Sequence, residues 1–395
     1  MFLLLVFYLL GFVLVLATLP LLAELLVLTS ASLLPAAREL APDARAEPLP
    51  ITVVIPAHNE EALIGRCIRS LLTTGAPDTE ILVVAHNCTD ATAAEAEAAG
   101  ARVLQLNDPA QAGKGCALRF GFAAALAGPS QAVLVIDADS VACSGLIAAV
   151  RLKFLSGARA LQCRYEVNNP NDNQRTQLMT LAFQAFNVIR PRGRERLGVS
   201  AGILGNGFAL HRETLERIPY GADSIVEDLE YHLTLIQAGI RVEFIDTVAV
   251  RGEMPLTNQG ASTQRARWEG GRQLMMRRWA PRLVADLLRG QFRVIEPLLD
   301  LLALPIATEL FLLLVAGCLP LVWLRLYALG ALLVLIAHIV AAAACGSSFW
   351  GTMRTLAAAP AYILWKLRLF PEIWRASRSN SVWIRTERDS PADGR

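Results

Sequence analysis

The sequence predicts an α/β domain with a parallel sheet, flanked by apolar helices toward both ends of the chain. Three observations support this prediction. Short β-rich runs alternate with helical runs between residues 51 and 136, and such alternation is typical of βαβ units. Long apolar runs lie on either side of that region. The whole chain is 54% hydrophobic with a mean hydropathy of +0.42, which is too apolar for an ordinary soluble enzyme.

The first apolar run covers residues 2 to 28 and is interrupted only by Glu24. A membrane-spanning helix needs ~20 such residues. A signal peptide has a basic start and a shorter apolar stretch, and this run has neither feature. We therefore expect residues 1–28 to be an uncleaved transmembrane anchor. Residues 29–50, rich in Pro and Ala, are expected to be a linker.

The second apolar block ends near residue 345. Arg325 divides it into residues 304–324 and 326–345, each close to one membrane thickness. The two halves are expected to form transmembrane helices of a hairpin with a short outer turn at Arg325. Residues 281–303 are expected to be an interfacial segment that leads into the hairpin.

Two carboxylates, Asp300 and Glu309, lie near the start of this second block. A carboxylate inside a membrane helix is costly and often functional. Near a membrane interface, solvated or snorkelling positions explain both residues more simply, and we expect them there.

Residues 346–395 are predicted to hold an interfacial amphipathic helix and a cytosolic tail. Aromatic and basic side chains are mixed there, as in such helices: Trp350, Arg354, Trp365, Lys366, Arg368, Phe370 and Trp374. Arginines also follow the first and the last apolar run, at positions 38, 45, 375, 378, 385 and 388. Because basic loops stay on the cytosolic side, we expect residues 51–280 in the cytosol and several crossings of a bacterial inner membrane.

Charge and cysteine usage exclude some classes of function. The formal net charge is only +2, so no basic surface for a nucleic acid is indicated. The seven cysteines form no CxxC pair and no Cys/His cluster with zinc-like spacing. We interpret them as free thiols in a reducing compartment, used for packing.

The elements of the central domain can be placed one by one. Strands are predicted at residues 51–55, 80–85, 102–106 and 132–136, and helices at residues 60–72, 90–99 and 115–127. Right-handed connections between such elements give a parallel sheet. Ligands of these sheets bind beyond the carboxyl ends of the strands, so the loops that follow the strands are where a site is expected.

Polar clusters occupy those loops: His58-Asn59-Glu60-Glu61, His86-Asn87-Cys88-Thr89-Asp90, Gly113-Lys114-Gly115 and Asp137-Ala138-Asp139. Any one of them could be a loop of solvated or capping residues, and Asp90 is suited to be a helix N-cap. Together, on one edge of a sheet, the clusters favour a site for a nucleotide diphosphate.

Asp137 and Asp139 carry the most specific chemistry. Residues two apart on an extended segment point to the same side, so both carboxylates can face one ligand. Two oxygen ligands suit Mg2+ or Mn2+ bridging a diphosphate. Lys114 lies between two glycines that let the backbone approach, and it can supply a positive charge for phosphate. A surface turn is the alternative interpretation of the pair.

Several motifs together point to one family: Ile55-Pro56-Ala57-His58-Asn59-Glu60-Glu61, Asn87-Cys88-Thr89-Asp90, Gly113-Lys114-Gly115, Asp137-Ala138-Asp139, Gly205-Asn206-Gly207, Glu227-Asp228 and Gln264-Arg265-Ala266-Arg267-Trp268. By these residues the sequence resembles the membrane-bound branch of the family 2 inverting glycosyltransferases. That branch includes cellulose-synthase-like and ceramide-glucosyltransferase-like enzymes, and the closing residues 383–388 are also similar to its tails. The resemblance covers about residues 51 to 280 and, in outline, the membrane segments.

The resemblance implies a GT-A fold, which is Rossmann-like and binds nucleotide-sugars, with a donor commonly linked to UDP. It implies a divalent metal, Mg2+ or Mn2+, held by Asp139, with Asp137 near the metal or the ribose. Asp228 would be the general base, with Glu227 beside it. Donor contacts are implied at Pro56, Asn59, Glu60, His86, Asn87, Asp90, Lys114, Asp137, Gln264, Arg267 and Trp268. Acceptor contacts are implied at Gly205, Asn206, Gly207 and Trp268.

Residues 264–268 match the QxxRW motif, which in the family lies by the pyrophosphate and the acceptor channel. An Arg can pair with a diphosphate and a Trp face can stack on a sugar. A basic amphipathic helix at the bilayer is the alternative interpretation, and both roles can hold together. His86 departs from the family, which usually has an Asp there that reads the nucleobase. A neutral imidazole still makes one hydrogen bond, so the choice of base stays open.

The resulting hypothesis is an inverting glycosyltransferase that moves a sugar from a nucleotide-sugar to an acceptor at the cytosolic membrane face. Three predicted spans are few for a polysaccharide channel, which favours a lipid or lipid-linked acceptor. An accessory subunit or a homo-oligomer could complete a pore, so a polysaccharide stays open. The alternative from another class is a non-catalytic membrane scaffold that retains the fold, supported only by His86. A membrane-bound nucleotidyltransferase would leave residues 264–268 unexplained.

Overall fold

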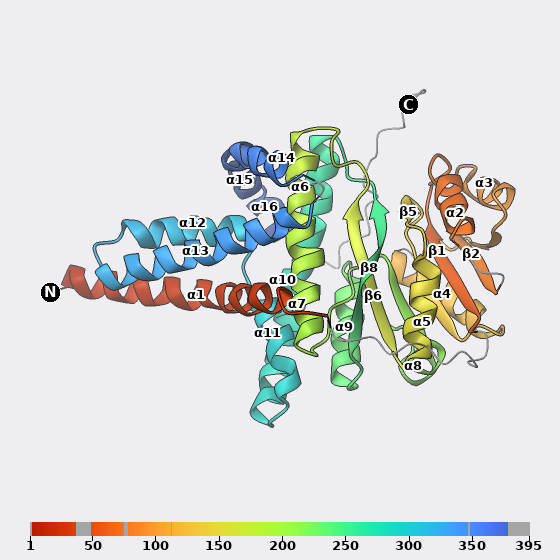
Figure 1. Cartoon of the computed structure of the whole chain (residues 1–395), viewed down its shortest axis with the longest axis horizontal. Coiled ribbons are helices and arrows are strands. Elements are labelled where there is room, and N and C mark those ends of the chain that lie inside the picture. The colour runs from red at the N-terminus through yellow and green to blue at the C-terminus, as the bar shows by residue number, and fades with distance from the viewer. Residues whose placement is uncertain (1, 37–48, 75–77, 112, 347, 378–395) are drawn as a thin grey trace.

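The computed structural model describes residues 2–36, 49–74, 78–111, 113–346 and 348–377. Within these ranges the chain forms an α/β body and a group of apolar helices that project from one side of it (Figure 1). The arginines at positions 38, 45, 378, 385 and 388 and the closing residues 383–388 lie outside the described residues. The predictions that rest on them stay predictions.

An eight-stranded mixed sheet forms the centre of the α/β body, in the order β3-β2-β1-β4-β7-β6-β8-β5. Its strands are β1 Ile51–Ala57, β2 Thr79–His86, β3 Arg102–Leu106, β4 Ala132–Val135, β5 Ser140–Ala142, β6 Ala160–Val167, β7 Phe208–His211 and β8 Val242–Gly252. The first four strands in the chain run parallel, as predicted. The parallel sheet does not continue, because β7 pairs antiparallel with both β4 and β6.

Apolar strands and amphipathic helices build a core on each face of the sheet. Every residue of β4 is buried. On one face α2 (Ile64–Leu72) buries a stripe with the spacing of one helix side, formed by Ile64, Cys67, Ile68 and Leu71. On the other face lie α4 (Lys114–Leu126) and α9 (Glu227–Gln237). The body also contains α3 Thr92–Ala98, α5 Leu146–Leu155 and α8 Arg212–Arg217.

Two long helical stretches stand between the sheet and the apolar helices (Figure 1). One runs through α6 (Gln174–Gln184), a π-helical turn (Ala185–Ile189) and α7 (Arg190–Arg196). The other is α10 (Asn258–Leu288), so the predicted boundary at residue 280 falls inside a helix. The first stretch contacts both the sheet and the apolar helices, and the second contacts α9 and α11. They join the two parts of the molecule.

Two helices are long and apolar enough to cross a membrane, α1 (Phe2–Ser32) and α13 (Val322–Ala344). A third candidate span is the helix pair Phe292–Leu302 and Ile306–Cys318, which is bent by 78°. This pair contains α11 (Ile295–Leu302) and α12 (Ile306–Cys318). By length and composition, the described residues therefore offer two spans, or three if the bent pair counts as one.

The predicted hairpin is wrong in the position of its turn. α12 ends at Cys318 and α13 begins at Val322, so the break lies at residues 319–321 and Arg325 is inside α13. Pro320 lies in this break, and a proline has no N–H to continue a helical hydrogen-bond ladder. The hydrophobicity pattern locates the apolar block, but the proline decides where it turns.

The first apolar helix packs directly on the α/β body. α1 and α7 contact each other closely. A Cβ at Gly193 of α7 would lie 2.2 Å from the Leu28 carbonyl oxygen of α1, so a glycine is required at this crossing. Glu24 of α1 forms ion pairs with Arg190 and Arg194 of α7. The anchor is therefore part of the folded unit.

The predicted interfacial helix is divided, among the described residues, into α14 (Phe349–Thr355), α15 (Ala359–Arg368) and α16 (Phe370–Ala376). Trp350 is 74% exposed, and its placement at a membrane interface stays a prediction. α15 lies against α10 through an ion pair of 2.7 Å between Lys366 and Glu269.

Candidate active site

A cavity of ≈ 680 Å³ lies at the carboxyl ends of β1, β2 and β4 and continues as far as the apolar helices. Most of the predicted site residues line it: Pro56, Glu60, His86, Asn87, Lys114, Asp137, Asp139, Gly205, Glu227, Asp228, Gln264, Arg267 and Trp268. The lining residues do not include Asn59, Asp90, Asn206 and Gly207. The structure thus gathers residues that are up to 212 positions apart in the sequence around one space, from Pro56 to Trp268.

Asp137 and Asp139 lie on a turn after β4 rather than on an extended segment. The Ser140 backbone N–H donates to the Asp137 carbonyl at 3.0 Å, which closes this turn. The Ser140 hydroxyl donates to Asp139 Oδ1 at 3.0 Å. Both carboxylates still line the cavity, so the predicted convergence holds although its stated geometric reason was wrong.

Asn206 positions this turn from below. Its Oδ1 accepts from the Asp137 backbone N–H at 3.1 Å, and its Nδ2 donates to the Ser140 hydroxyl at 2.8 Å. Asn206 is 0% exposed, so it has no surface to offer an acceptor. The structure corrects the predicted acceptor contact to a positioning role.

Lys114 begins α4 and points into the carboxylate cluster. Its ammonium donates to Asp137 Oδ1 and, at 2.5 Å, to the Gly205 carbonyl. Burial alone would lower the pKa of Lys114, but the charges of Asp137 and Glu227 outweigh it and hold this pKa above its usual value. Lys114 therefore stays positive, as the predicted phosphate contact requires.

Glu227 and Asp228 form the first turn of α9. Burial raises the pKa of both carboxyls, and the Asp228 charge raises that of Glu227 further. Lys114 and Arg267 oppose this rise. A Cβ at Gly205 would lie 2.8 Å from Asp228 Oδ2, and Gly205 also has φ 77°. Glycine is thus required where the loop approaches the predicted base.

The QxxRW residues lie near the N-terminus of α10 on the cavity wall. Gln264 is buried. Trp268 packs on Phe183, with ring centroids 6.2 Å apart, and the Arg265 guanidinium lies 5.6 Å from the Trp268 ring centre. The motif is therefore packed into the protein and faces the cavity, which disfavours the alternative of a helix that only lies on the bilayer.

His86 holds a loop closed at the end of the cavity beside β1 and β2. Its Nε2 donates to the Gln111 carbonyl at 2.7 Å, and burial lowers the pKa of His86 below its usual value. Asn87 fastens the same loop, since its Nδ2 donates to the Asp108 carbonyl at 3.0 Å and its Oδ1 accepts from the Asp108 N–H at 2.8 Å. The imidazole is neutral and has one ring nitrogen left for a ligand.

Asn59 and Asp90 brace the neighbouring loops. Asn59 Oδ1 accepts from the Thr89 N–H at 2.8 Å. Asp90 accepts from the Thr92 N–H at 3.0 Å and from the Glu61 N–H at 3.3 Å. The N-cap position of α3 is Ala91, which makes no side-chain cap bond. Asp90 accepts from the N–H of Thr92, the first helical residue, so its side chain makes a capping contact, as predicted.

The residues fit a divalent cation that is shared with a ligand. Among the described residues, no three His, Cys, Asp or Glu side chains gather into a site that could hold a metal alone. Asp137 and Asp139 supply oxygen atoms, which Mg2+ and Mn2+ prefer. A diphosphate and water would complete the coordination, as is usual for Mg2+ bound with a nucleotide.

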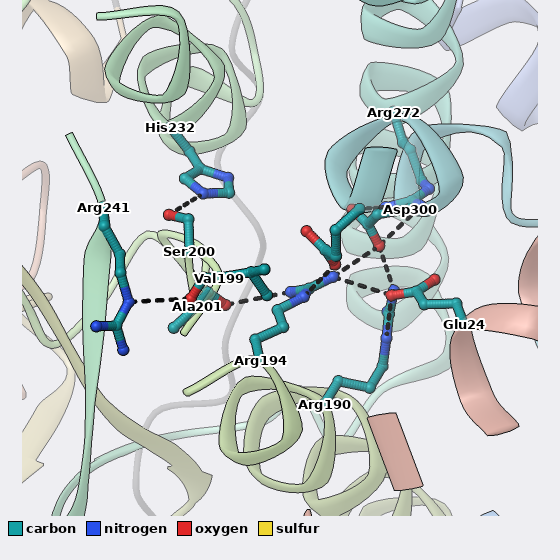
Figure 2. Close-up of polar contacts among 11 residues, drawn as sticks. Glu24, Arg190, Arg194, Val199, Ser200, Ala201, His232, Arg241, Arg272 and Asp300 are labelled. Carbon is teal, nitrogen blue, oxygen red and sulfur yellow. Dashed lines mark hydrogen bonds and ion pairs between the residues drawn. The ribbon is translucent and has the colours of Figure 1, made fainter. Parts of the chain in front are cut away.

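The sequence reasoning missed a buried ion cluster where α1, α7, α10 and α11 meet (Figure 2). Its arginines are Arg190, Arg194 and Arg272, and its carboxylates are Glu24, Glu296 and Asp300. The expected solvated positions are wrong for Asp300, whose side chain is 13% exposed, and for Glu309, which is 0% exposed. A carboxylate in an apolar run and arginines repeated at 190, 192, 194 and 196 were the available signals.

Comparisons with known proteins bear on the fold and the family. The profile described as Glycosyltransferase like family 2 matches residues 48–271. The curated "Probable glycosyltransferase YdaM" of Bacillus subtilis (strain 168) is 26% identical over 237 residues. That match covers 57% of this chain and 56% of the relative, so the chain spans just over half of the relative's length.

Among solved structures, mannosyltransferase PcManGT from Pyrobaculum calidifontis, in complex with GDP-Man and Mn2+, has a TM-score of 0.57 at 19% identity. The superposition covers 94% of this chain and 97% of that chain. Glucosyl-3-phosphoglycerate synthase from Mycobacterium tuberculosis, with Mn2+, uridine-diphosphate and phosphoglyceric acid, has a TM-score of 0.41 at 25% identity, over 56% of this chain and 76% of that chain. The likeness to PcManGT confirms the predicted GT-A, Rossmann-like fold. Since the family profile covers more than half of the sequence, this chain belongs to the glycosyltransferase-like family 2.

Proposed function

We propose that the protein is a metal-dependent inverting glycosyltransferase that moves a sugar from a nucleotide-sugar, commonly UDP-linked in the family, to an acceptor at the membrane. One observation carries this proposal. The carboxylate turn, Lys114, the Glu227-Asp228 pair and the QxxRW residues line a cavity that continues to the apolar helices. Such an arrangement suits one substrate that is water-soluble and one that is held in a membrane.

The donor end of the cavity would hold the nucleotide diphosphate. Asp139 and Asp137 would hold Mg2+ or Mn2+, which would neutralise the charge that grows on the departing diphosphate. Lys114 would add a positive charge, and Arg267 would pair with phosphate oxygens. His86, Asn87 and their loop would contact the nucleoside through the remaining imidazole nitrogen and backbone groups. The base preference follows from that contact.

Asp228 would be the general base, with Glu227 supporting its charge state. The acceptor oxygen attacks the anomeric carbon while the bond from that carbon to the diphosphate oxygen breaks. The hydroxyl proton goes to the Asp228 carboxylate, and the nucleoside diphosphate leaves. Attack from the side opposite the leaving group inverts the anomeric centre.

The continuation of the cavity supports a lipid or lipid-linked acceptor. Where the cavity reaches the apolar helices, α1, α6, α12, α13 and α15 contribute apolar lining residues, beside charged ones from α7, α10, α11 and α15. Burying an alkyl chain there is favourable by ~0.8 kcal/mol for each methylene. A polysaccharide would need a wide polar channel, which an accessory subunit or a homo-oligomer would have to complete. A multi-pass placement in a bacterial inner membrane, with residues 51–280 in the cytosol, fits this proposal.

The rival function is a membrane scaffold that binds without catalysis. His86 is its support, because the family usually has an Asp there. The imidazole and Asn87 nevertheless hold the donor loop in place, and Asp137, Asp139 and Asp228 all line the cavity. A catalytic role therefore accounts for more of the residues than a scaffold does.

A donor-release assay tests the function directly. The full chain in detergent would be incubated with UDP-, GDP- and dTDP-sugars, Mn2+ or Mg2+, and a membrane lipid extract, and nucleoside diphosphate would be measured. We expect release from one donor, lost in Asp139→Ala and in EDTA but kept in Glu80→Gln, a surface variant whose carboxylate pairs with Arg102. Pyrophosphate release would instead indicate a nucleotidyltransferase. No release and no donor binding by calorimetry would favour the scaffold.

A further inference from the structure

The acceptor end of the cavity has two parts with different chemistry. The far part is apolar and includes Leu21, Leu25, Ala303, Leu304, Leu310 and Ile339. Between this part and Trp268 lies a set of charged lining residues that we call the ionic band: Arg190, Arg194, Arg272, Asp300, Glu269 and Lys366. The head of an amphiphile whose chain fills the apolar part would lie against the ionic band.

Carboxylates already hold the guanidinium groups of the ionic band (Figure 2). Arg190 Nε donates to Glu24 Oε1 at 3.0 Å. Arg194 Nη2 donates to the same oxygen at 3.0 Å and lies 3.3 Å from Asp300 Oδ1. Arg272 reaches the two Asp300 oxygens at 3.2 and 3.3 Å. Arg190 also pairs with Asp300, and Arg194 also pairs with Glu296.

The charges in and behind the ionic band cancel. The three guanidiniums face three carboxylates, those of Glu24, Glu296 and Asp300. Lys366 faces Glu269 at 2.7 Å, and each of these two side chains is 13% exposed. The Arg190 and Arg194 side chains are 2% and 5% exposed. The band is therefore a neutral, desolvated set of ion pairs.

A phosphate head does not fit a neutral band. It would have to displace a carboxylate from a guanidinium and leave that carboxylate buried without its partner, which is strongly unfavourable. A hydroxyl head displaces nothing and can donate a hydrogen bond. Among the described residues, Glu24 Oε2 and Glu296 Oε2 are buried acceptors without a donor. Neither Glu24 nor Glu296 lines the cavity, so a head group meets the carboxylates of Asp300 and Glu269 instead. These carboxylates can accept a hydrogen bond from a hydroxyl, whereas they repel a phosphate anion.

We infer that the acceptor is an amphiphile with an uncharged, hydroxyl-bearing head, of the diacylglycerol or neutral glycolipid class, and not a lipid phosphate. The inference rests on the proposed function and narrows its acceptor. It also matches the place of Asp228, since a neutral hydroxyl needs a base to take its proton, whereas a phosphate is already ionised at neutral pH.

Arg265 is the residue at which a phosphate head would bind if this inference were wrong. Its guanidinium lines the cavity beside the ionic band. It donates to the Tyr362 hydroxyl at 2.9 Å and lies over the Trp268 ring. Within the part of the chain that the structure describes, Arg265 has none of the ion pairs that neutralise Arg190, Arg194 and Arg272.

Lipid retention by the full chain tests the inference. Dioleoylglycerol and dioleoyl phosphatidate differ only by the phosphate, and native mass spectrometry in detergent micelles would measure the bound ratio at equal concentration. Ile363→Trp narrows the cavity from α15, so lipid that this variant still retains is bound elsewhere and is subtracted. We expect the wild type to favour dioleoylglycerol by about tenfold or more, because the cations of the ionic band are already paired with carboxylates.

Two variants that remove one carboxylate each should change this ratio. Asp300→Asn leaves three guanidiniums against two carboxylates. Glu269→Gln changes a different part of the cavity wall and leaves Lys366 without its carboxylate partner. Each should shift retention toward phosphatidate by about tenfold, whereas Glu80→Gln should not change it. Glu269→Gln keeps the test decisive if Asp300→Asn does not fold.

The opposite results would overturn the inference. The inference would be wrong if the wild type preferred phosphatidate, or if phosphatidate binding were lost in Arg265→Gln. It would also be wrong if a folded carboxylate variant left the ratio of the two lipids unchanged, or if neither lipid were retained. The failure of the proposed function is a separate result, since calorimetry with nucleoside diphosphates and metal would then show no binding at the donor end. Donor binding with the wrong lipid preference would sink only the inference.

Discussion

The two ends of the cavity handle charge in opposite ways. At the proposed donor end Asp137, Asp139, Glu227 and Asp228 outnumber the nearby cations Lys114 and Arg267. At the end that reaches the apolar helices, three arginines meet three carboxylates and the charges cancel. A surplus of negative charge indicates where a cation belongs, because a bound cation must supply the missing positive charge. Where the charges balance, no charged ligand is needed to neutralise the site.

The charged side chains are also more exposed at the proposed donor end than at the end beside the apolar helices. The Lys114 and Asp137 side chains at the donor end are 20% and 30% exposed, so water and ligands reach them. The Arg190 and Glu24 side chains are 2% and 1% exposed. A buried pair of opposite charges contributes little net stability, but removing one partner is costly. The proposed donor end is therefore accessible to ligands, whereas the ion pairs of Glu24 with Arg190 and Arg194 hold α1 on the α/β body.

We expect the largest effect on the rate of sugar transfer from a change at Asp228, the proposed general base. Asp228→Asn should reduce sugar transfer by about 10²–10⁴-fold, the usual contribution of a general base. The folded state should not suffer, since the change removes repulsion with Glu227. Transfer rate and thermal unfolding of the same preparation check both statements. A folded Asn variant with full activity would remove Asp228 from the base role.

The next largest effect is expected on stability when one of the balanced ion pairs beside the apolar helices is broken. Arg190→Met leaves Glu24 and Asp300 with an unmatched buried charge and should destabilise the protein by about 3–5 kcal/mol. The double variant Glu24→Leu with Arg190→Met restores the balance, because Arg194 and Arg272 then face Glu296 and Asp300. It should recover most of the loss in detergent unfolding curves. Equal destabilisation by the single and double variants would contradict the idea of charge balance.

A third effect concerns the support of the carboxylate turn. Asn206→Ala removes the contacts to the Asp137 N–H and the Ser140 hydroxyl. Outer-shell partners of metal ligands typically change metal affinity by about 10–100-fold, so the Mn2+ concentration for half-maximal activity should rise by that factor. Gln131→Ala, on the surface at the other end of the sheet, serves as the control. An unchanged metal requirement would show that Asn206 does not act through the metal.

The predictable part of this molecule is the part written in local patterns. Alternation of short apolar runs with amphipathic helices predicts the first four strands and their parallel pairing, and the polar loops after them predict the end of the cavity where we propose that the donor binds. Asp137 and Asp139 were found this way because their carboxylates follow a buried strand directly. Long apolar runs likewise predict α1 and the block that contains α12 and α13.

The rest depends on contacts between distant segments, which local patterns do not encode. β7 reverses the sheet after the long excursion through α6 and α7. Asp300 looks solvated in sequence because its three arginine partners lie at positions 190, 194 and 272. Asn206 looks like an acceptor contact until its burial under Asp137 is known. Tertiary pairing of charges was thus the main feature that sequence reasoning could not supply.

The smallest effect is expected in the pH dependence of kcat/KM, which the Glu227-Asp228 pair should set. Burial and the Asp228 charge raise the pKa of Glu227 from 4.5 to about 7, and burial raises the pKa of Asp228. A base works only when deprotonated, so kcat/KM should fall several-fold as pH falls from 8 to 6, well above the range in which an ordinary carboxyl titrates. Because these pKa values are raised on folding, the same acidification should slightly stabilise the protein.

Glu227→Gln gives this pH dependence its matched control. Without the neighbouring charge the pKa of Asp228 should fall, so the acid limb of the rate profile should move to lower pH while the chemistry remains. A conservative change at the balanced end, Lys366→Arg, keeps its pair with Glu269 and should leave the limb where it is. If both variants moved it equally, the titrating group would not be the Glu227-Asp228 pair. If neither variant moved the acid limb, the titrating group would lie elsewhere in the protein. The surplus of buried carboxylates would then be the only feature that distinguishes this end of the cavity.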